Sequence, residues 1–245
     1  MRWLHWILQG KGGVGKSFAA YILFQYFSLK NAKVYGIDTD PINPTFGGYK
    51  EFNVEILPLM VRDEIEPRAF DLVVERSVAM GDGSHVVVDS GSSTFKPASK
   101  YLHEGGVIDE VIRANNVSLV IHTVINGKPA LQDTIDGLVT LATNFTDIPI
   151  VVWLNPKDGD IQSNGHGFYD FLAYKNHSSQ FHSVIELPHL SYATYGKDLV
   201  DHLARKQSFD AAIHSSLSIM TRHRLGKYWE AVVEELDKAN LLEIA

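Results

Sequence analysis

The stretch GKGGVGKS, residues 10–17, constrains this chain more than any other part of the sequence. It fits G-x-x-x-x-G-K-[ST], in which glycines let successive backbone N–H groups converge on phosphate oxygens. The apolar run before it, residues 3–9, predicts a strand, and residues 17–30 predict a helix. A phosphate loop needs this context, because the helix N-terminus attracts the anion. The residues expected to contact a nucleotide here are Gly10, Lys11, Gly12, Gly13, Val14, Gly15, Lys16, Ser17 and Phe18.

Predicted strands and helices alternate along the rest of the chain. We expect strands at 33–38, 84–89, 117–125, 148–155 and 183–188, a loop at 90–97, and helices at 67–80, 107–114, 129–144, 167–174, 195–204 and 216–239. Apolar strands that are each followed by a helix favour a parallel sheet with right-handed crossovers. The predicted fold class is therefore α/β: one P-loop NTPase domain over residues 1–245, with a mostly parallel twisted sheet and helices on both faces.

Composition narrows the classes of function. Hydrophobic residues make up 45% of the 245 residues, enough for a sizeable core, and the apolar runs are far shorter than a membrane span. The absence of cysteine excludes disulfides, thiolate metal sites and a cysteine nucleophile. The N-terminus runs directly into the first strand, so we expect a soluble, cytoplasmic protein. The net charge of −7 argues weakly against tight nucleic-acid binding.

Two acids stand at the ends of predicted strands, where ligands of open α/β sheets bind. Asp40 follows KVYGID, and Asp89 ends HVVVD. Phosphoryl transfer needs carboxylates that hold a metal and orient water, so we expect Ser17, Asp40 and Asp89 to bind Mg²⁺. A strand-end aspartate can instead simply cap a turn, but the convergence of several strand ends on a phosphate loop favours the metal site. Asp38 fits either the site or a hydrogen bond to its own loop.

These motifs resemble those of the ParA/MinD group of P-loop ATPases. The loop resembles that group's deviant Walker A motif, with Lys11 as the extra signature lysine, and IDTDP and VVVDSG resemble its Walker A′ and Walker B elements. The resemblance implies an ATP-dependent homodimer with ATP sandwiched between the chains. It also implies that Lys11, Lys16 and Asp40 serve catalysis, with Lys11 acting across the dimer. The sequence departs from the group at residues 90–92, Ser-Gly-Ser, where a proline is common.

A finer resemblance is to the TraL proteins of plasmid conjugation systems and related plasmid-stability ATPases. It rests on DTDPINPTFGGY, VVDSGSSTFKPASKYL and HTVINGKPALQDTIDGL. It implies a protein partner in plasmid transfer or partition, with weak ATP turnover when that partner is absent. A basic amphipathic C-terminal helix would indicate a membrane anchor, but the tail EAVVEELDKANLLEIA is acidic. Nonspecific DNA is a further candidate partner through Arg222, Arg224 and Lys227, although a solvated helix face explains these three residues more simply.

The stretch NPKD, residues 155–158 at the end of the strand predicted over 148–155, bears on whether the protein binds adenine or guanine. The family resemblance implies that Asn155 hydrogen-bonds adenine and that Pro188 abuts the base, although Pro188 fits a simple turn equally well. Asp158 lies three residues after Asn155, as in the guanine-reading N-K-x-D pattern. Lys157 comes one place too late for that pattern, so ATP is favoured over GTP.

Two other functions remain open. The chain could be a nucleotide-dependent adaptor with negligible turnover, in which the ATP state itself is the signal. It could also be a small-molecule ligase or kinase that resembles dethiobiotin synthetase. The phosphate loops of that class lack the signature lysine, so Lys11 argues against it.

Overall fold

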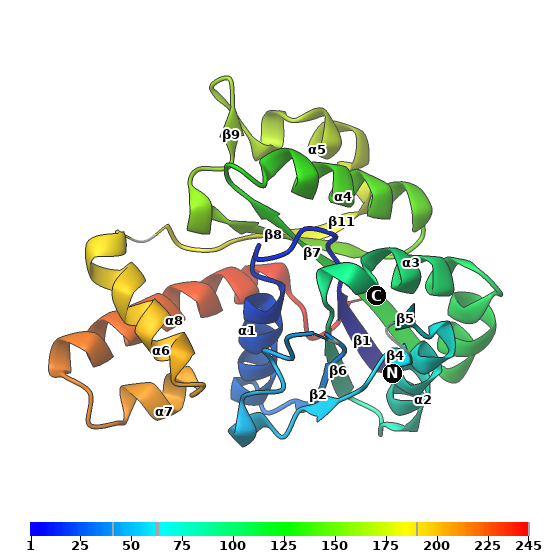
Figure 1. Ribbon diagram of the computed structural model, residues 1–245, viewed down its shortest axis with the longest axis horizontal. Helices are drawn as coiled ribbons and strands as arrows, with labels where there is room; N and C mark the ends of the chain where they lie inside the picture. Colours follow the sequence, from blue (N-terminus) through cyan, green and yellow to red (C-terminus); the bar gives the residue numbers. More distant parts are fainter. Residues whose placement is uncertain (41, 62–63, 190, 245) are drawn as a thin grey trace.

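A seven-stranded sheet forms the centre of the computed structural model, which describes residues 1–40, 42–61, 64–189 and 191–244 (Figure 1). The strand order is β11-β8-β7-β1-β6-β2-β3, and all neighbours pair in parallel. The bounds are β1 (Arg2–Ile7), β2 (Lys33–Asp38), β3 (Glu55–Ile56), β6 (Ser84–Asp89), β7 (Val117–Asn126), β8 (Ile150–Asn155) and β11 (Phe181–Glu186). The predicted fold class is confirmed. The two-residue edge strand β3 was not predicted.

Helices cover both faces of the sheet (Figure 1). They are α1 (Lys16–Leu29), α2 (Asp71–Ala79), α3 (Phe95–His103), α4 (Leu131–Asn144), α5 (Leu172–His177), α6 (Lys197–Ala204), α7 (Phe209–Ile213) and α8 (Ile219–Ala239). One apolar cluster joins α1 and α8 to the sheet, and a second joins α2, α3 and α4 to the opposite face. Among the helices in the described part of the chain, none is both long and apolar enough to cross a membrane.

The first helix is apolar on nearly every side because other elements surround it. Residues 19–27 of α1 are all buried, between the sheet, α8 and the segment after β2. A helix that is hydrophobic all round needs such a position. The predicted end near Asn31 is confirmed, since Asn31 has a φ of 57°, the left-handed conformation that commonly follows a helix.

The predictions miss several short elements. No helix was predicted at the position of α3, and its first three residues fall in the loop predicted over 90–97. Pro97 is compatible with this helix because it lies in the first turn, where its missing N–H removes no bond. The helix predicted at 167–174 begins only at Leu172 and follows a small hairpin, β9 (Gln162–Ser163) and β10 (His166–Gly167). The Asn164-Gly165 turn of this hairpin is a signal that the sequence did offer. The pair β4 (Met60–Val61) and β5 (Glu64–Ile65) was also missed.

Three buried histidines on neighbouring strands form a hydrogen-bonded ladder on the α1 side of the sheet. Trp153 Nε1 can only donate, and it lies 3.0 Å from His122 Nδ1. His122 Nε2 therefore carries the proton and donates to His5 Nδ1 at 3.0 Å, and His5 Nε2 donates to His85 Nδ1 at 3.0 Å. Burial lowers the pKa of His122 to about 3 and that of His85 to about 4. The ladder is therefore neutral at physiological pH.

Candidate nucleotide-binding site

The phosphate loop lies between β1 and α1, in the strand–loop–helix context that the sequence predicts. Gly13 and Gly15 have φ angles of 77° and 111°, a region that side chains other than glycine rarely adopt. A Cβ atom at Gly15 would also lie 2.5 Å from Asn155 Nδ2. Glycine is therefore required at Gly15 both by its backbone conformation and by the close approach of the loop after β8.

Lys16 begins α1 and points back into its own loop. Its side chain is 7% exposed, and Nζ donates to the Lys11 carbonyl oxygen at 2.9 Å. Burial lowers the pKa of Lys16, while the charges of Asp89 and Asp40 act in the opposite direction. The loop thus holds a buried ammonium group close to two acids, where a phosphate would add the negative charge that this lysine needs.

Asp89 ends β6 beside the phosphate loop and is almost fully buried. Neither carboxylate oxygen has a hydrogen-bond partner among the described residues. Burial raises the pKa of Asp89 to about 7 and the charge of Asp38 adds to this effect, while the polar hydroxyl of nearby Ser17, which is not within hydrogen-bonding geometry, and the charge of Lys16 oppose it. An unpartnered buried carboxylate is costly. Its oxygens, next to a serine hydroxyl, form the hard-oxygen donor set that suits Mg²⁺.

Removal of this buried charge should stabilise the nucleotide-free protein. We expect Asp89→Asn to raise the unfolding free energy at pH 8 by about 1–3 kcal/mol, because ionised Asp89 is unfavourable when buried. The gain is limited to this range because the asparagine amide also lacks hydrogen-bond partners. The gain should shrink as the pH falls through about 7, where Asp89 itself becomes neutral. Urea unfolding at pH 6 and pH 8 measures both effects, and a variant less stable than wild type at pH 8 would contradict this reading.

Asp38, the last residue of β2, and Asp40, two residues beyond it, have different roles. Asp38 accepts hydrogen bonds from the N–H groups of Asp40 at 2.9 Å and Gly47 at 2.8 Å, so it orders the loop rather than facing a ligand. Asp40 Oδ1 accepts from the N–H groups of Ile42 and Asn43. The second oxygen of Asp40 remains for a metal ion or a water molecule.

Two adjacent cavities meet at Gly15 and Phe18. The first has a volume of about 310 Å³ and is lined by the phosphate loop together with Asp40, Ser90 and Ser92. The second, of about 540 Å³, is lined by apolar side chains that include Leu187, Leu199, Leu203 and Tyr228. This pair of cavities fits a ligand that has an anionic end and a flat apolar end. A nucleotide has these two ends, its phosphates and its base.

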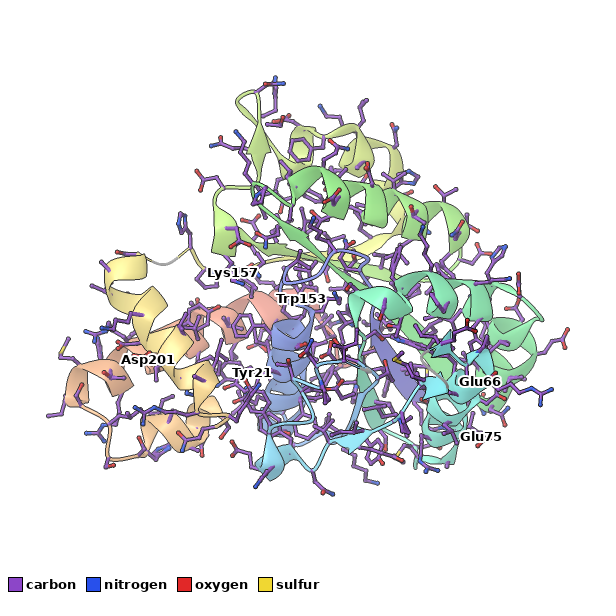
Figure 2. All side chains as sticks on the ribbon, in the orientation of Figure 1. Tyr21, Glu66, Glu75, Trp153, Lys157 and Asp201 are labelled. Carbon is purple, nitrogen blue, oxygen red and sulfur yellow. The ribbon has the colours of Figure 1, made fainter. Side chains whose placement is uncertain are left out.

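The predicted base-contact residues line the larger cavity. Asn155 Nδ2 donates to the Val14 carbonyl at 2.8 Å, and its Oδ1 accepts from the Lys157 N–H at 3.3 Å, so one amide N–H remains for a base. Pro188 lies on the wall of the same cavity. Lys157, labelled in Figure 2, directs Nζ to the Gly13 carbonyl at 3.3 Å and so connects the base loop to the phosphate loop.

Asp158 is held by the side chain of Asn126, for which no role was predicted from the sequence. Asn126 Nδ2 donates to Asp158 Oδ2 at 2.7 Å, and the Asp158 N–H donates to Asn126 Oδ1 at 3.4 Å. The guanine-reading acid needs both oxygens for the base, whereas Asp158 has one of them occupied.

Lys11 lies at the mouth of the loop, with 43% of its side chain exposed. Its Nζ lies 2.7 Å from Asp133 Oδ2, on α4 of the same chain. This partner was not predicted from the sequence, because an acid in the first turn of a helix also has the ordinary role of offsetting the helix dipole. Gln9 was not predicted either, although a polar residue at the end of an otherwise apolar strand, directly before the glycine loop, is a signal that the sequence did offer.

Two of the three basic residues on α8 that suggested DNA contacts form ion pairs within the chain. Arg224 forms an ion pair with Asp198, and Lys227 Nζ lies 2.6 Å from Glu230. Two of the three positive charges that suggested DNA contacts are thus offset within the chain. This weakens the case for DNA and favours the simpler explanation, a solvated helix face.

Comparison with known protein families matches residues 6–244 to the CobQ/CobB/MinD/ParA nucleotide binding domain. Two proteins of Escherichia coli, each named Protein TraL, are 43% and 41% identical over 241 residues, which is 98% of this chain and 99% of each relative. The septum site-determining protein MinD of Pyrococcus horikoshii, complexed with Mg-ADP, has a TM-score of 0.57 at 16% identity over 100% of both chains. The cell division ATPase MinD of Pyrococcus furiosus has a TM-score of 0.55, also at 16% identity, over 97% of this chain and 99% of that one.

Proposed function

Because the chain belongs to the CobQ/CobB/MinD/ParA nucleotide-binding family, we propose that it is a magnesium-dependent ATPase that dimerises around ATP. One observation carries this proposal: the buried, unpartnered Asp89 carboxylate beside Lys16, at the end of a strand next to a phosphate loop. The process it serves is plasmid conjugal transfer or plasmid maintenance, with a protein partner from that system. The similarity to Protein TraL over nearly the whole chain supports this assignment.

Each site residue then has a role. Lys16 and the loop N–H groups bind the phosphates. Ser17, Asp40 and Asp89 would hold Mg²⁺, which when bound neutralises charge on the phosphate oxygens. Because the first oxygen of Asp40 orders the loop, its second oxygen would serve both the metal ion and the attacking water. Lys11 supplies a further positive charge to the γ-phosphate of the second chain.

The larger cavity favours adenine over guanine. Asp158 has one oxygen bound by Asn126, so it lacks the pair of acceptors that guanine requires. Asn155 retains an amide N–H that can donate to a ring nitrogen of adenine. A competition titration of the protein with Mg-ATP and Mg-GTP measures this preference.

A second candidate function is a switch that binds ATP and a partner but hardly hydrolyses ATP. The contact between Lys11 and Asp133 favours it, because a lysine held by its own chain supplies no charge to a γ-phosphate. Phosphate release measured with and without DNA and the partner separates the two functions: the ATPase responds to one of these additions, and the switch does not.

Lys16→Ala tests nucleotide binding directly. We expect the Kd for Mg-ATP to rise about 30- to 1,000-fold, since loss of one partner of a buried charged contact costs roughly 2–4 kcal/mol. Titration calorimetry measures the effect. The matched control is Lys30→Ala. Lys30 follows the last residue of α1, at the end away from the phosphate loop, and forms an ion pair with Asp237 of α8. Binding that is unchanged in Lys16→Ala would refute the proposed site.

A further inference from the structure

Gln9, the residue immediately before the phosphate loop, directs its side chain at the loop's own backbone. It is 1% exposed. Its Oε1 accepts hydrogen bonds from the N–H groups of Gly10 at 2.8 Å and Lys11 at 3.4 Å. These two N–H groups are thus taken up by the protein, and phosphate binding falls to the N–H groups from Gly12 onward.

The other end of the Gln9 carboxamide is held by β7 and α4. Nε2 lies 3.2 Å from Thr123 Oγ1, 3.3 Å from the Val124 carbonyl and 3.1 Å from the Thr134 carbonyl. The two carbonyl oxygens can only accept hydrogen bonds, so they fix which end of the amide carries the oxygen. The orientation that presents Oε1 to the loop is therefore set by a segment more than 100 residues away in the sequence.

Gly137 makes this arrangement sterically feasible. A Cβ atom at this position of α4 would lie 2.3 Å from Gln9 Oε1 and 2.9 Å from its Nε2. Glycine inside a helix costs about 1 kcal/mol relative to alanine. The chain accepts this cost where α4 must come close to Gln9.

The same stretch of chain, HTVINGKPALQDTIDGL at residues 122–138, contacts the site at two further points. Asp133 pairs with Lys11 at 2.7 Å. Asn126 holds the base loop through Asp158 at 2.7 Å. Residues 122–138, here called the bracket segment, therefore reach both the phosphate loop and the base loop.

We propose that Gln9, oriented by the bracket segment and accommodated by Gly137, is a positioning residue that sets the backbone of the phosphate loop for nucleotide binding. The inference rests on the proposed nucleotide-binding function. Lys11 is held at three atoms: its N–H by Gln9, its carbonyl oxygen by Lys16, and its Nζ by Asp133. Loss of the Gln9 contacts releases the first of these and leaves two loop N–H groups without their acceptor.

Gln9→Met tests the proposal, because methionine keeps the length of the side chain and removes its hydrogen bonds. The matched control is Gln25→Met. Gln25 is also buried, and it bonds to the Tyr21 carbonyl and the Phe209 N–H, far from the loop. We expect the Kd for Mg-ADP, measured by calorimetry, to rise about tenfold in Gln9→Met, the loss expected for one to two hydrogen bonds. In Gln25→Met it should stay within about twofold, although both variants lose stability to urea.

A second measurement needs no nucleotide. Hydrogen exchange at the N–H groups of Gly10 and Lys11 should be at least about tenfold faster in Gln9→Met than in wild type, and unchanged in Gln25→Met. An equal rise in Kd in both variants, or unchanged exchange in Gln9→Met, overturns the positioning role. If wild type does not bind Mg-ADP, the proposed function fails, and the exchange rates still decide whether Gln9 orders the loop.

Gly137 gives an independent check. Gly137→Ala should raise the Kd at least about fivefold in the wild-type background and less than about twofold in a Gln9→Ala background, where the collision partner is gone. Gly226→Ala is the control, since a Cβ there meets Ile213 at an ordinary 3.9 Å. Equal effects of Gly137→Ala in both backgrounds would show that Gly137 does not serve Gln9.

Discussion

Replacement of Lys11 by alanine is expected to lower ATP turnover by roughly 10³-fold or more, while the Kd for Mg-ATP changes by less than about threefold. In the proposed site, Lys16 and the loop N–H groups bind the phosphates of the same chain, so we expect that Lys11 is not needed to hold the nucleotide. A cation supplied from a second chain stabilises the charge of the transition state, and in related phosphoryl transfers it contributes about 10³–10⁵ in rate. The effect should therefore fall on turnover and on ATP-dependent dimerisation.

Phosphate release and sedimentation velocity with ATP measure these two quantities. Lys30→Ala serves again as the control, because it removes a paired lysine away from the site. If Lys11→Ala retains wild-type turnover and still dimerises with ATP, the proposed action across the dimer is wrong. If turnover is negligible in wild type even with DNA and the partner, the switch function is favoured over the ATPase.

Mild acid is expected to destabilise the fold by about 3–4 kcal/mol per pH unit between pH 5.5 and 4.5. Burial lowers the pKa of His122 to about 3 and those of His85 and His202 to about 4, and it places the pKa of His5 well below its usual value. The unfolded chain takes up protons at these four histidines below about pH 6.5, while the folded chain does not. Stability is therefore complete above that pH and is lost as the pH falls.

Asp89 acts in the opposite direction. Because its pKa is about 7 in the folded protein and about 4 in the unfolded chain, Asp89 is protonated in the folded state and ionised in the unfolded state between about pH 7 and pH 4. Each group contributes about 1.4 kcal/mol per pH unit; Asp89 offsets one of the four histidines, and Asp38, whose pKa burial also raises, offsets part of another. The net slope remains large against a typical total stability of about 5–15 kcal/mol.

Urea unfolding at pH 7, 5.5 and 4.5 measures this slope. His85→Phe should reduce it by about 1.4 kcal/mol per pH unit, because phenylalanine does not titrate. It also keeps the stacking on Trp3 and Phe27, whose ring centroids lie 4.6 Å and 4.1 Å from that of His85. A slope near zero in wild type, or an unchanged slope in the variant, would show that the ladder is not neutral.

The phosphate loop and the strand ends around it could be predicted from the sequence, because their signals are local. Glycine spacing in residues 10–17 dictates a loop of converging N–H groups, and apolar strands followed by helices dictate a parallel sheet. The carboxyl ends of parallel strands lie at one edge, which brings Asp40 and Asp89 toward Lys16 without any knowledge of side-chain packing. The same reasoning favoured Asp40 for the site but left Asp38 open between the site and a hydrogen bond to its own loop, and only the loop hydrogen bonds of the structure decide between these two roles.

The contacts that position the site depend on tertiary structure. Gln9 meets residues more than 100 positions away, Lys11 meets Asp133, and Asp158 meets Asn126. Each pair joins elements that are neighbours only because the strand order places β7 between β1 and β8. A glutamine, a helix-terminal aspartate or a loop asparagine has many ordinary roles, and its residue type alone does not name its partner. Local backbone preference therefore predicts where phosphate binds, while the packing of β7 and α4 against the loop decides how that loop is held.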